Sequence, residues 1–102
     1  MDTNLAIRKR IHEFVDRAEN DLSKAVEWYE SRQKGLELIF LNKVQEYLES
    51  IQQNSLQYPL KRSLYREVFL RKFPYIIIYE VREGEVGVYS IFHTHRNPDS
   101  RP

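Results

Sequence analysis

The hydrophobic period of this chain changes once, near Asn54–Pro59, and that change constrains the fold more than any other feature of the sequence. Before it, apolar residues recur with the spacing of one face of an amphipathic helix. After it, they alternate with a period near two and are mostly β-branched or aromatic, as in strands. We therefore expect a helical first half, a break at Asn54, Ser55 and Tyr58-Pro59, and a β-sheet second half.

Two helices are expected in the first half. Asp16 followed by Glu19 has the form of a capping box and predicts that a helix starts there. Gly35 offers a left-handed stop, and a second helix fits 36 to about 53. The apolar stripe of the first helix is Ala18, Leu22, Ala25, Val26 and Tyr29, and that of the second is Leu41, Val44, Leu48 and Ile51, widened by Phe40 and Tyr47. The two stripes predict an antiparallel helical hairpin.

Strands are expected at 63–71, 75–82 and 85–92, and a short one at 11–15 before the helices. Phe73-Pro74 separates the first two long strands, and Glu83-Gly84 supplies a two-residue hairpin turn. The strand at 75–79 is apolar at both parities, which is typical of a central strand covered on both faces.

These elements predict an α+β fold of order β-α-α-β-β-β, with an antiparallel sheet packed on one face by the N-terminal helical hairpin. The other face of the sheet is expected to be open. Basic side chains would line that open face: Arg66, Arg71, Lys72, His93 and Arg96.

Length and composition limit the possible classes. A chain of 102 residues with 41% apolar and 30% charged residues forms one compact domain. It has no cysteine, which excludes disulfides and thiol chemistry, and no apolar run near the roughly 20 residues of a membrane span. We expect a cytoplasmic protein that does not contact membranes. Residues 1–56 hold 8 basic and 10 acidic residues (net −2) and residues 57–102 hold 8 and 5 (net +3), which leaves open a basic face for an anionic partner or ordinary surface variation.

Few catalytic motifs fit the sequence. Three glycines cannot form a phosphate-binding or dinucleotide-binding loop, and His93-Thr94-His95 lacks further metal ligands, so no cofactor and no metal are expected. Metal-independent RNA cleavage remains possible because RNA carries its own 2′-hydroxyl nucleophile. In that reading His93 or His95 is acid or base, and Tyr89, at the parity of His93, stacks a base or donates a proton. The phosphate would be held by Arg66, Arg71 and Arg96. Ordinary surface roles for these residues are the alternative.

The chain as a whole resembles the RelE/ParE superfamily of bacterial toxins. The resemblance runs from about Ile11 to Pro98 and is carried by motifs in a fixed order: Ala18-Glu19-Asn20-Asp21-Leu22, Trp28-Tyr29-Glu30, Gly35-Leu36, Phe40, Val44, Leu48, Ile51, Arg66, Phe73-Pro74-Tyr75, Tyr79, His93 and Arg96-Asn97-Pro98. It implies the fold class reached above, with a flexible extension at 1–9, a single toxin domain at 10–98 and a tail at 99–102. It also implies a growth-arresting toxin neutralised by a cognate antitoxin in a hetero-oligomeric complex.

Two branches of the superfamily are distinguished by one position. The branch that cleaves messenger RNA on the ribosome typically has an arginine just after the aromatic residue that opens the strand, and this chain has Ile76 there. The Phe73-Pro74-Tyr75 start and the ending from His93 to Pro98 look more like the ParE, or plasmid-stabilisation, branch, whose members poison DNA gyrase. This resemblance implies a binding toxin, with RNA cleavage and a degenerate, non-toxic interaction module as alternatives.

Candidate interaction residues follow from that reading. The target, DNA gyrase or the ribosome with its message, would be contacted by Arg66, Arg71, Lys72, Tyr89, His93, His95 and Arg96. An antitoxin segment that folds on binding needs apolar anchors, and Trp28, Tyr29 and Phe40 near the helical hairpin are the candidates. Core packing is the alternative for these aromatic residues.

Overall fold

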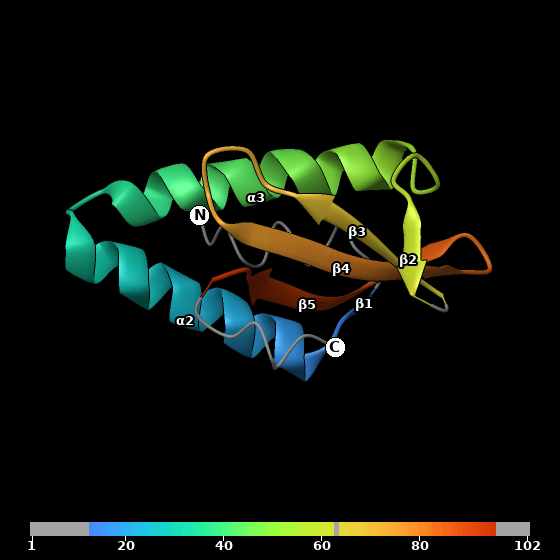
Figure 1. Ribbon diagram of the computed structural model, residues 1–102, viewed down its shortest axis with the longest axis horizontal. Coiled ribbons are helices and arrows are strands. Elements are labelled where there is room, and N and C mark those ends of the chain that lie inside the picture. The colour runs from blue at the N-terminus through green and yellow to red at the C-terminus, as the bar shows by residue number, and fades with distance from the viewer. Residues whose placement is uncertain (1–12, 63, 96–102) are drawn as a thin grey trace.

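The computed structural model, which describes residues 13–62 and 64–95, has two helices and five strands in those ranges. They are β1 (Glu13–Phe14), α2 (Asp16–Arg32), α3 (Leu36–Gln53), β2 (Leu60–Arg62), β3 (Tyr65–Phe69), β4 (Tyr75–Arg82) and β5 (Glu85–His93). Figure 1 shows the two helices diverging from their common turn, with strands β3–β5 seen between them. This arrangement confirms the predicted α+β fold with a helical hairpin against one face of a sheet.

The helices begin and end close to the predicted positions, but the start of α2 is built differently. Val15, in an extended conformation, is the N-cap, and its carbonyl oxygen accepts the Glu19 N–H at 3.0 Å. No side chain caps the helix, so the predicted capping box is wrong. Asp16 and Glu19 lie in the first turn instead, where carboxylates interact favourably with the helix dipole. Gly35 has the expected left-handed conformation, with φ of 88°, and directly precedes α3.

The predicted apolar stripes form most of the core between the helices and the sheet. Eight members of the two stripes are buried, and Val26, Leu41 and Tyr47 are half-buried beside them. The sheet contributes side chains of alternate β4 residues to the same core, namely Tyr75, Ile77 and Tyr79. At the end nearest the helical turn, Tyr29 and Phe40 pack with Phe73 and Tyr75, with ring centroids 5.0–6.1 Å apart. This aromatic cluster ties both helices to the start of β4.

The strand order is β1-β5-β4-β3-β2. Strands β2 to β5 pair antiparallel, as predicted, whereas β1 pairs parallel to β5 through Glu13–Gly87 and Phe14–Val88. Strand β1 is thus the edge strand beside β5, although the two helices and strands β2 to β4 separate them in sequence. The strand expected at 63–71 is shorter, at 65–69, and the short β2 precedes it.

A β-bulge interrupts the pairing of β4 with β5. Ile78 pairs with Ser90 and Tyr79 pairs with Val88, so Tyr89 is an extra residue on β5. An extra residue shifts the alternation of side chains beyond it. Tyr89 consequently packs beside Ile78, whereas His93 lies opposite Tyr75, whose side chain belongs to the helix-facing core. The prediction that Tyr89 shares a face with His93 is therefore wrong.

The face of the sheet away from the helices is apolar at its centre. Ile76, Ile78 and Phe92 form a second buried cluster, flanked by the half-buried rings of Tyr65 and Tyr89. Ile76 is 0% exposed. The expected open basic face is therefore wrong for the described residues, because the strand parity assigns apolar side chains to its centre.

Candidate functional site

Arg66 lies on the helix-facing side of the sheet and holds the loop after α3. It pairs across strands with Tyr79, whose ring is in the core. Its Nη1 donates to the carbonyl oxygens of Tyr58 at 2.6 Å and Leu56 at 3.3 Å, while the Tyr79 hydroxyl donates to the Ser55 carbonyl oxygen at 2.8 Å. Burial raises the pKa of Tyr79 to about 12, although nearby Arg66 opposes the rise. The Arg66 guanidinium therefore stabilises the loop after α3 through these hydrogen bonds.

Arg66 and His93 lie too far apart to act on one phosphate group. Arg66 pairs with Tyr79 and His93 pairs with Tyr75, on opposite sides of β4 and four residues apart along it. Strand geometry puts the two Cα atoms about 13 Å apart along the strand and about 10 Å apart across it, or about 16 Å in total. The Arg66 guanidinium does not shorten this distance toward His93, because it bonds the Tyr58 and Leu56 carbonyl oxygens. A general acid or base must reach its proton within about 3 Å. The predicted catalytic group of Arg66 and His93 is therefore not assembled.

His93 lies at the end of β5, against Tyr75. The two rings meet edge to face with centroids 4.9 Å apart, and the His95 backbone N–H donates to His93 Nδ1 at 3.1 Å. This hydrogen bond assigns the acceptor role to Nδ1, so a neutral His93 carries its proton on Nε2. The ring is half-buried and that of exposed His95 lies 6.0 Å away.

The turn between β3 and β4 brings two more predicted residues to the same end of the sheet. The Thr94 N–H and hydroxyl donate to the Pro74 carbonyl oxygen at 2.9 and 3.2 Å, which fastens this turn beside the end of β5. Arg71 and Lys72 are exposed on the turn. We call Arg71, Lys72, His93 and His95 the basic end of the sheet. The predicted residue Arg96 lies outside the described residues, as do the predicted extension at 1–9 and tail at 99–102.

Tyr89 belongs to a separate pair of aromatic residues on the other face. Its ring packs on Tyr65 with centroids 4.9 Å apart, and the Arg17 guanidinium lies 5.8 Å from its centroid. The fold therefore separates the predicted target-binding residues. Four of them form the basic end, Arg66 stabilises the loop after α3, and Tyr89 lies on the other face of the sheet.

The three predicted antitoxin-binding residues have different exposures. Phe40 is 0% exposed, and Tyr29 is buried against it in the aromatic cluster, so both match the core-packing alternative. Trp28 is half-buried, and the Arg32 guanidinium lies 3.8 Å from the centroid of its ring. Trp28 is thus the member of the predicted set that retains a substantial surface.

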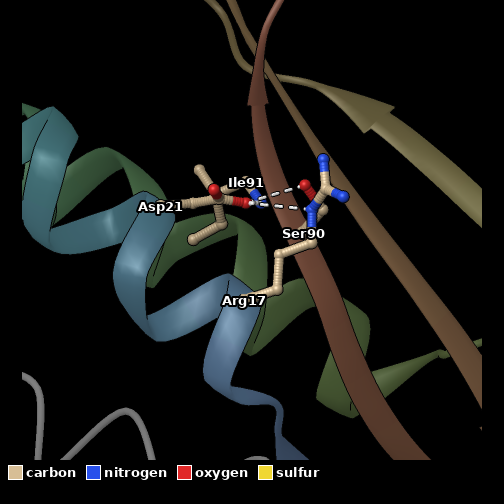
Figure 2. A network of polar contacts seen from close by, with 4 residues as sticks. All are labelled: Arg17, Asp21, Ser90 and Ile91. Carbon is tan, nitrogen blue, oxygen red and sulfur yellow. Dashed lines mark hydrogen bonds and ion pairs between the residues drawn. The ribbon is translucent and has the colours of Figure 1, made fainter. Parts of the chain in front are cut away.

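The polar network around Asp21 was not predicted from the sequence. Asp21 Oδ2 accepts hydrogen bonds from Ser90 Oγ at 2.8 Å and the Ile91 N–H at 3.0 Å, with Arg17 Nε 3.9 Å away (Figure 2). The Asp21 carboxylate therefore accepts the Ile91 N–H at the edge of β5, beyond the residues of β5 that pair with β1. The one sequence signal is the position of Asp21 directly beside the buried stripe residue Leu22.

The described part of the chain contains no group of three or more histidine and acidic side chains placed to hold a metal ion. None of its helices is long and apolar enough to cross a membrane.

Comparison with known proteins identifies the family. A model of the ParE toxin of the type II toxin-antitoxin system parDE matches residues 13–98. A structure of the chromosomal ParDE toxin-antitoxin system from P. aeruginosa is similar in fold, with a TM-score of 0.68 and 20% sequence identity over 79% of this chain and 91% of that chain. No curated protein matches the sequence. Since the family model covers most of the sequence, the chain belongs to the ParE toxin family of type II toxin-antitoxin systems.

Proposed function

We propose that this toxin arrests growth by binding a macromolecular target such as DNA gyrase, without cleaving nucleic acid, and that a cognate antitoxin neutralises it. The separation of Arg66 from His93 carries the first part of the proposal. Ribonuclease chemistry at one phosphate needs cations and an acid or base within contact distance of that phosphate. Arg66 instead donates to the Leu56 and Tyr58 carbonyl oxygens, and strand geometry puts its Cα about 16 Å from the Cα of His93.

The position of Ile76 supports the same conclusion. The RNA-cleaving branch typically has an arginine at that position, and here the isoleucine side chain is fully buried. An apolar side chain cannot stabilise a charged phosphorane. The proposal therefore places the interaction with the target at the basic end, through Arg71, Lys72, His93 and His95, in the cytoplasm.

The antitoxin is proposed to contact Trp28. Aromatic side chains that expose part of their surface are favoured anchors in protein interfaces, and the Arg32 guanidinium over the ring adds a cation beside it. Tyr29 and Phe40 support this contact from the core rather than touching the partner.

Growth after induced expression in bacteria without antitoxin tests the proposal, combined with mapping of 5′ ends on translated messages. Arrest without new 5′ ends is the expected result for the wild-type chain. New 5′ ends that disappear in His93→Gln would instead assign the RNA-cleaving mechanism. Continued growth in the presence of folded chain would assign the non-toxic interaction module.

A further inference from the structure

The outer edge of β3 presents backbone groups at Phe69 that no described residue pairs. The Glu67 N–H points away from β4 and donates to the Pro59 carbonyl oxygen at 3.3 Å, whereas the Leu70 N–H points toward β4 and donates to the Tyr75 carbonyl oxygen at 2.9 Å. Backbone groups alternate in direction along a strand, so the N–H and C=O of Phe69 point outward, beside Glu67 and away from β4. Strand β2 does not reach Phe69. It begins at Leu60, opposite Arg66, and runs antiparallel to β3, away from Phe69.

The side chains around this edge are those of a binding surface. Phe69, the residue whose backbone groups point outward, also has a side chain that is 58% exposed. Arg71 and Lys72 follow it, both exposed and without an ion-pair partner among the residues described. We call Phe69, Arg71 and Lys72 the edge patch.

The backbone of the edge patch is strained and held rigidly. Lys72 has a φ of 74°, a left-handed conformation that glycine adopts more readily than other residues do. The turn is fixed by the Tyr75 N–H, which donates to the Phe73 carbonyl oxygen at 2.7 Å, and by the Phe73 ring, which packs on Tyr29 and Phe40 in the core. The turn thus presents the exposed Arg71 and Lys72 directly after β3, from a backbone anchored to the core.

We propose that the edge patch docks an extended acidic segment of the antitoxin, which adds a strand beside β3. The inference rests on the proposed function, since it adds a second surface, besides that of Trp28, on which the antitoxin acts. An extended polypeptide offers a donor and an acceptor at the spacing of Phe69, whereas a DNA backbone offers acceptors only. Acidic side chains of the segment pair with Arg71 and Lys72, and an apolar side chain packs on the Phe69 ring. Because Arg71 and Lys72 also belong to the basic end, the docked segment covers part of the target-binding surface.

A short synthetic peptide that alternates glutamate and valine is the probe for this surface. We expect millimolar peptide to shift the amide NMR signals of residues 69–72 in the full chain and to slow hydrogen exchange of the Phe69 amide. Phe69→Ala is expected to weaken binding about tenfold, the loss of an aromatic anchor. A lysine–valine peptide and single-stranded oligothymidine are expected to leave these signals unchanged. Binding of either of them in place of the acidic peptide would overturn the proposal.

Lys72→Gly separates binding from folding. Glycine relieves the strained φ, so the variant folds at least as stably, while the loss of the exposed charge weakens binding of the glutamate–valine peptide about threefold. Glu83→Gly is the matched control, because Glu83 also has a positive φ, of 51°, on the β4–β5 turn. It is expected to leave peptide binding unchanged. Equal affinities of Lys72→Gly and the wild-type chain would overturn the proposal.

Growth arrest is a separate readout. A chain that arrests growth but does not bind the acidic peptide overturns the edge patch and leaves the toxin function intact. A chain that binds the peptide as described but does not arrest growth overturns the toxin function, and strand addition at β3 stands.

Discussion

The Asp21 carboxylate of α2 accepts a hydrogen bond from the Ser90 hydroxyl of β5 at 2.8 Å, directly after the bulge that contains Tyr89. The same oxygen accepts the Ile91 N–H. Two residues 69 positions apart in sequence thus join the helical hairpin to the edge of the sheet. Through this contact, α2 supplies a hydrogen-bond acceptor at the edge of β5 beyond the end of the two-residue strand β1.

Asp21→Ala is expected to lower the free energy of unfolding by about 2 kcal/mol. The substitution leaves the buried Ser90 hydroxyl and the Ile91 N–H without their acceptor, and an unsatisfied buried donor costs about 1–3 kcal/mol. Asp21→Asn keeps one acceptor oxygen and should lose less. Urea denaturation measures the free energy of unfolding of both variants. Glu27→Ala, at an exposed position of α2, is the control. A loss for Asp21→Ala no larger than that for Glu27→Ala would contradict the role of the network.

The pKa of Tyr79 predicts a loss of stability at high pH. Burial raises this pKa from 10.0 to about 12, so the folded state disfavours the phenolate that the unfolded state forms above pH 10. The stabilisation is complete below pH 10 and is lost as the pH rises toward 12, by up to about 2–3 kcal/mol. Denaturation at a series of pH values checks this against Tyr79→Phe. That variant loses about 1 kcal/mol at neutral pH, with its hydrogen bond to Ser55, but should show a shallower alkaline decline. Parallel declines for the two chains would argue against the assignment.

Arg66→Ala is expected to reduce stability and to leave the toxin mechanism unchanged. Removing the guanidinium leaves the Leu56 and Tyr58 carbonyl oxygens without their donor, at a cost of about 2 kcal/mol. Thermal denaturation measures the loss, and growth arrest is scored well below the midpoint temperature. The control is Arg82→Ala. Arg82 is an exposed arginine on β4 whose guanidinium forms an ion pair with Glu80 at 3.3 Å. Loss of arrest by a folded Arg66→Ala chain would show that Arg66 contacts the target.

Glu83→Asn is expected to raise stability by about 0.5–1 kcal/mol. Glu83 and Gly84 both have positive φ, of 51° and 79°, and such two-residue turns strongly favour Asn-Gly. Asparagine tolerates the left-handed conformation better than glutamate does. The midpoint of thermal unfolding should rise by a few degrees. A lower midpoint would mean that the glutamate side chain contributes to the turn in a way that its backbone angles do not reveal.

Periodicity predicted the elements well because burial imposes it directly on the sequence. The stripe from Ala18 to Tyr29 predicted the helix α2, and the run of β-branched and aromatic residues at 75–79 predicted the central strand β4. The capping box failed because Val15, still in extended backbone after β1, occupies the N-cap position that Asp16 would need.

The candidate site was less predictable than the fold because it depends on register. Parity counting put Tyr89 with His93, but one extra residue in β5 separates them, and a bulge leaves no clear mark in the sequence. Arg66 and His93 both have side chains suited to phosphate chemistry. The distance between them is known only from the register, in which Arg66 pairs with Tyr79 and His93 pairs with Tyr75. The turn holding Arg71 and Lys72 reaches the end of β5 through hydrogen bonds from Thr94 to Pro74, which no local pattern encodes.

Supercoiling of relaxed plasmid by purified DNA gyrase, measured with increasing amounts of the purified chain, tests the central claim most directly. A toxin that binds gyrase is expected to reduce supercoiling in proportion to its concentration, and charge reversal of Arg71 and Lys72 together should weaken the inhibition. Charge reversal of Lys24, an exposed lysine of α2, is the matched control and should leave it intact. Unchanged supercoiling at a large excess of folded chain would contradict the assignment of gyrase as the target.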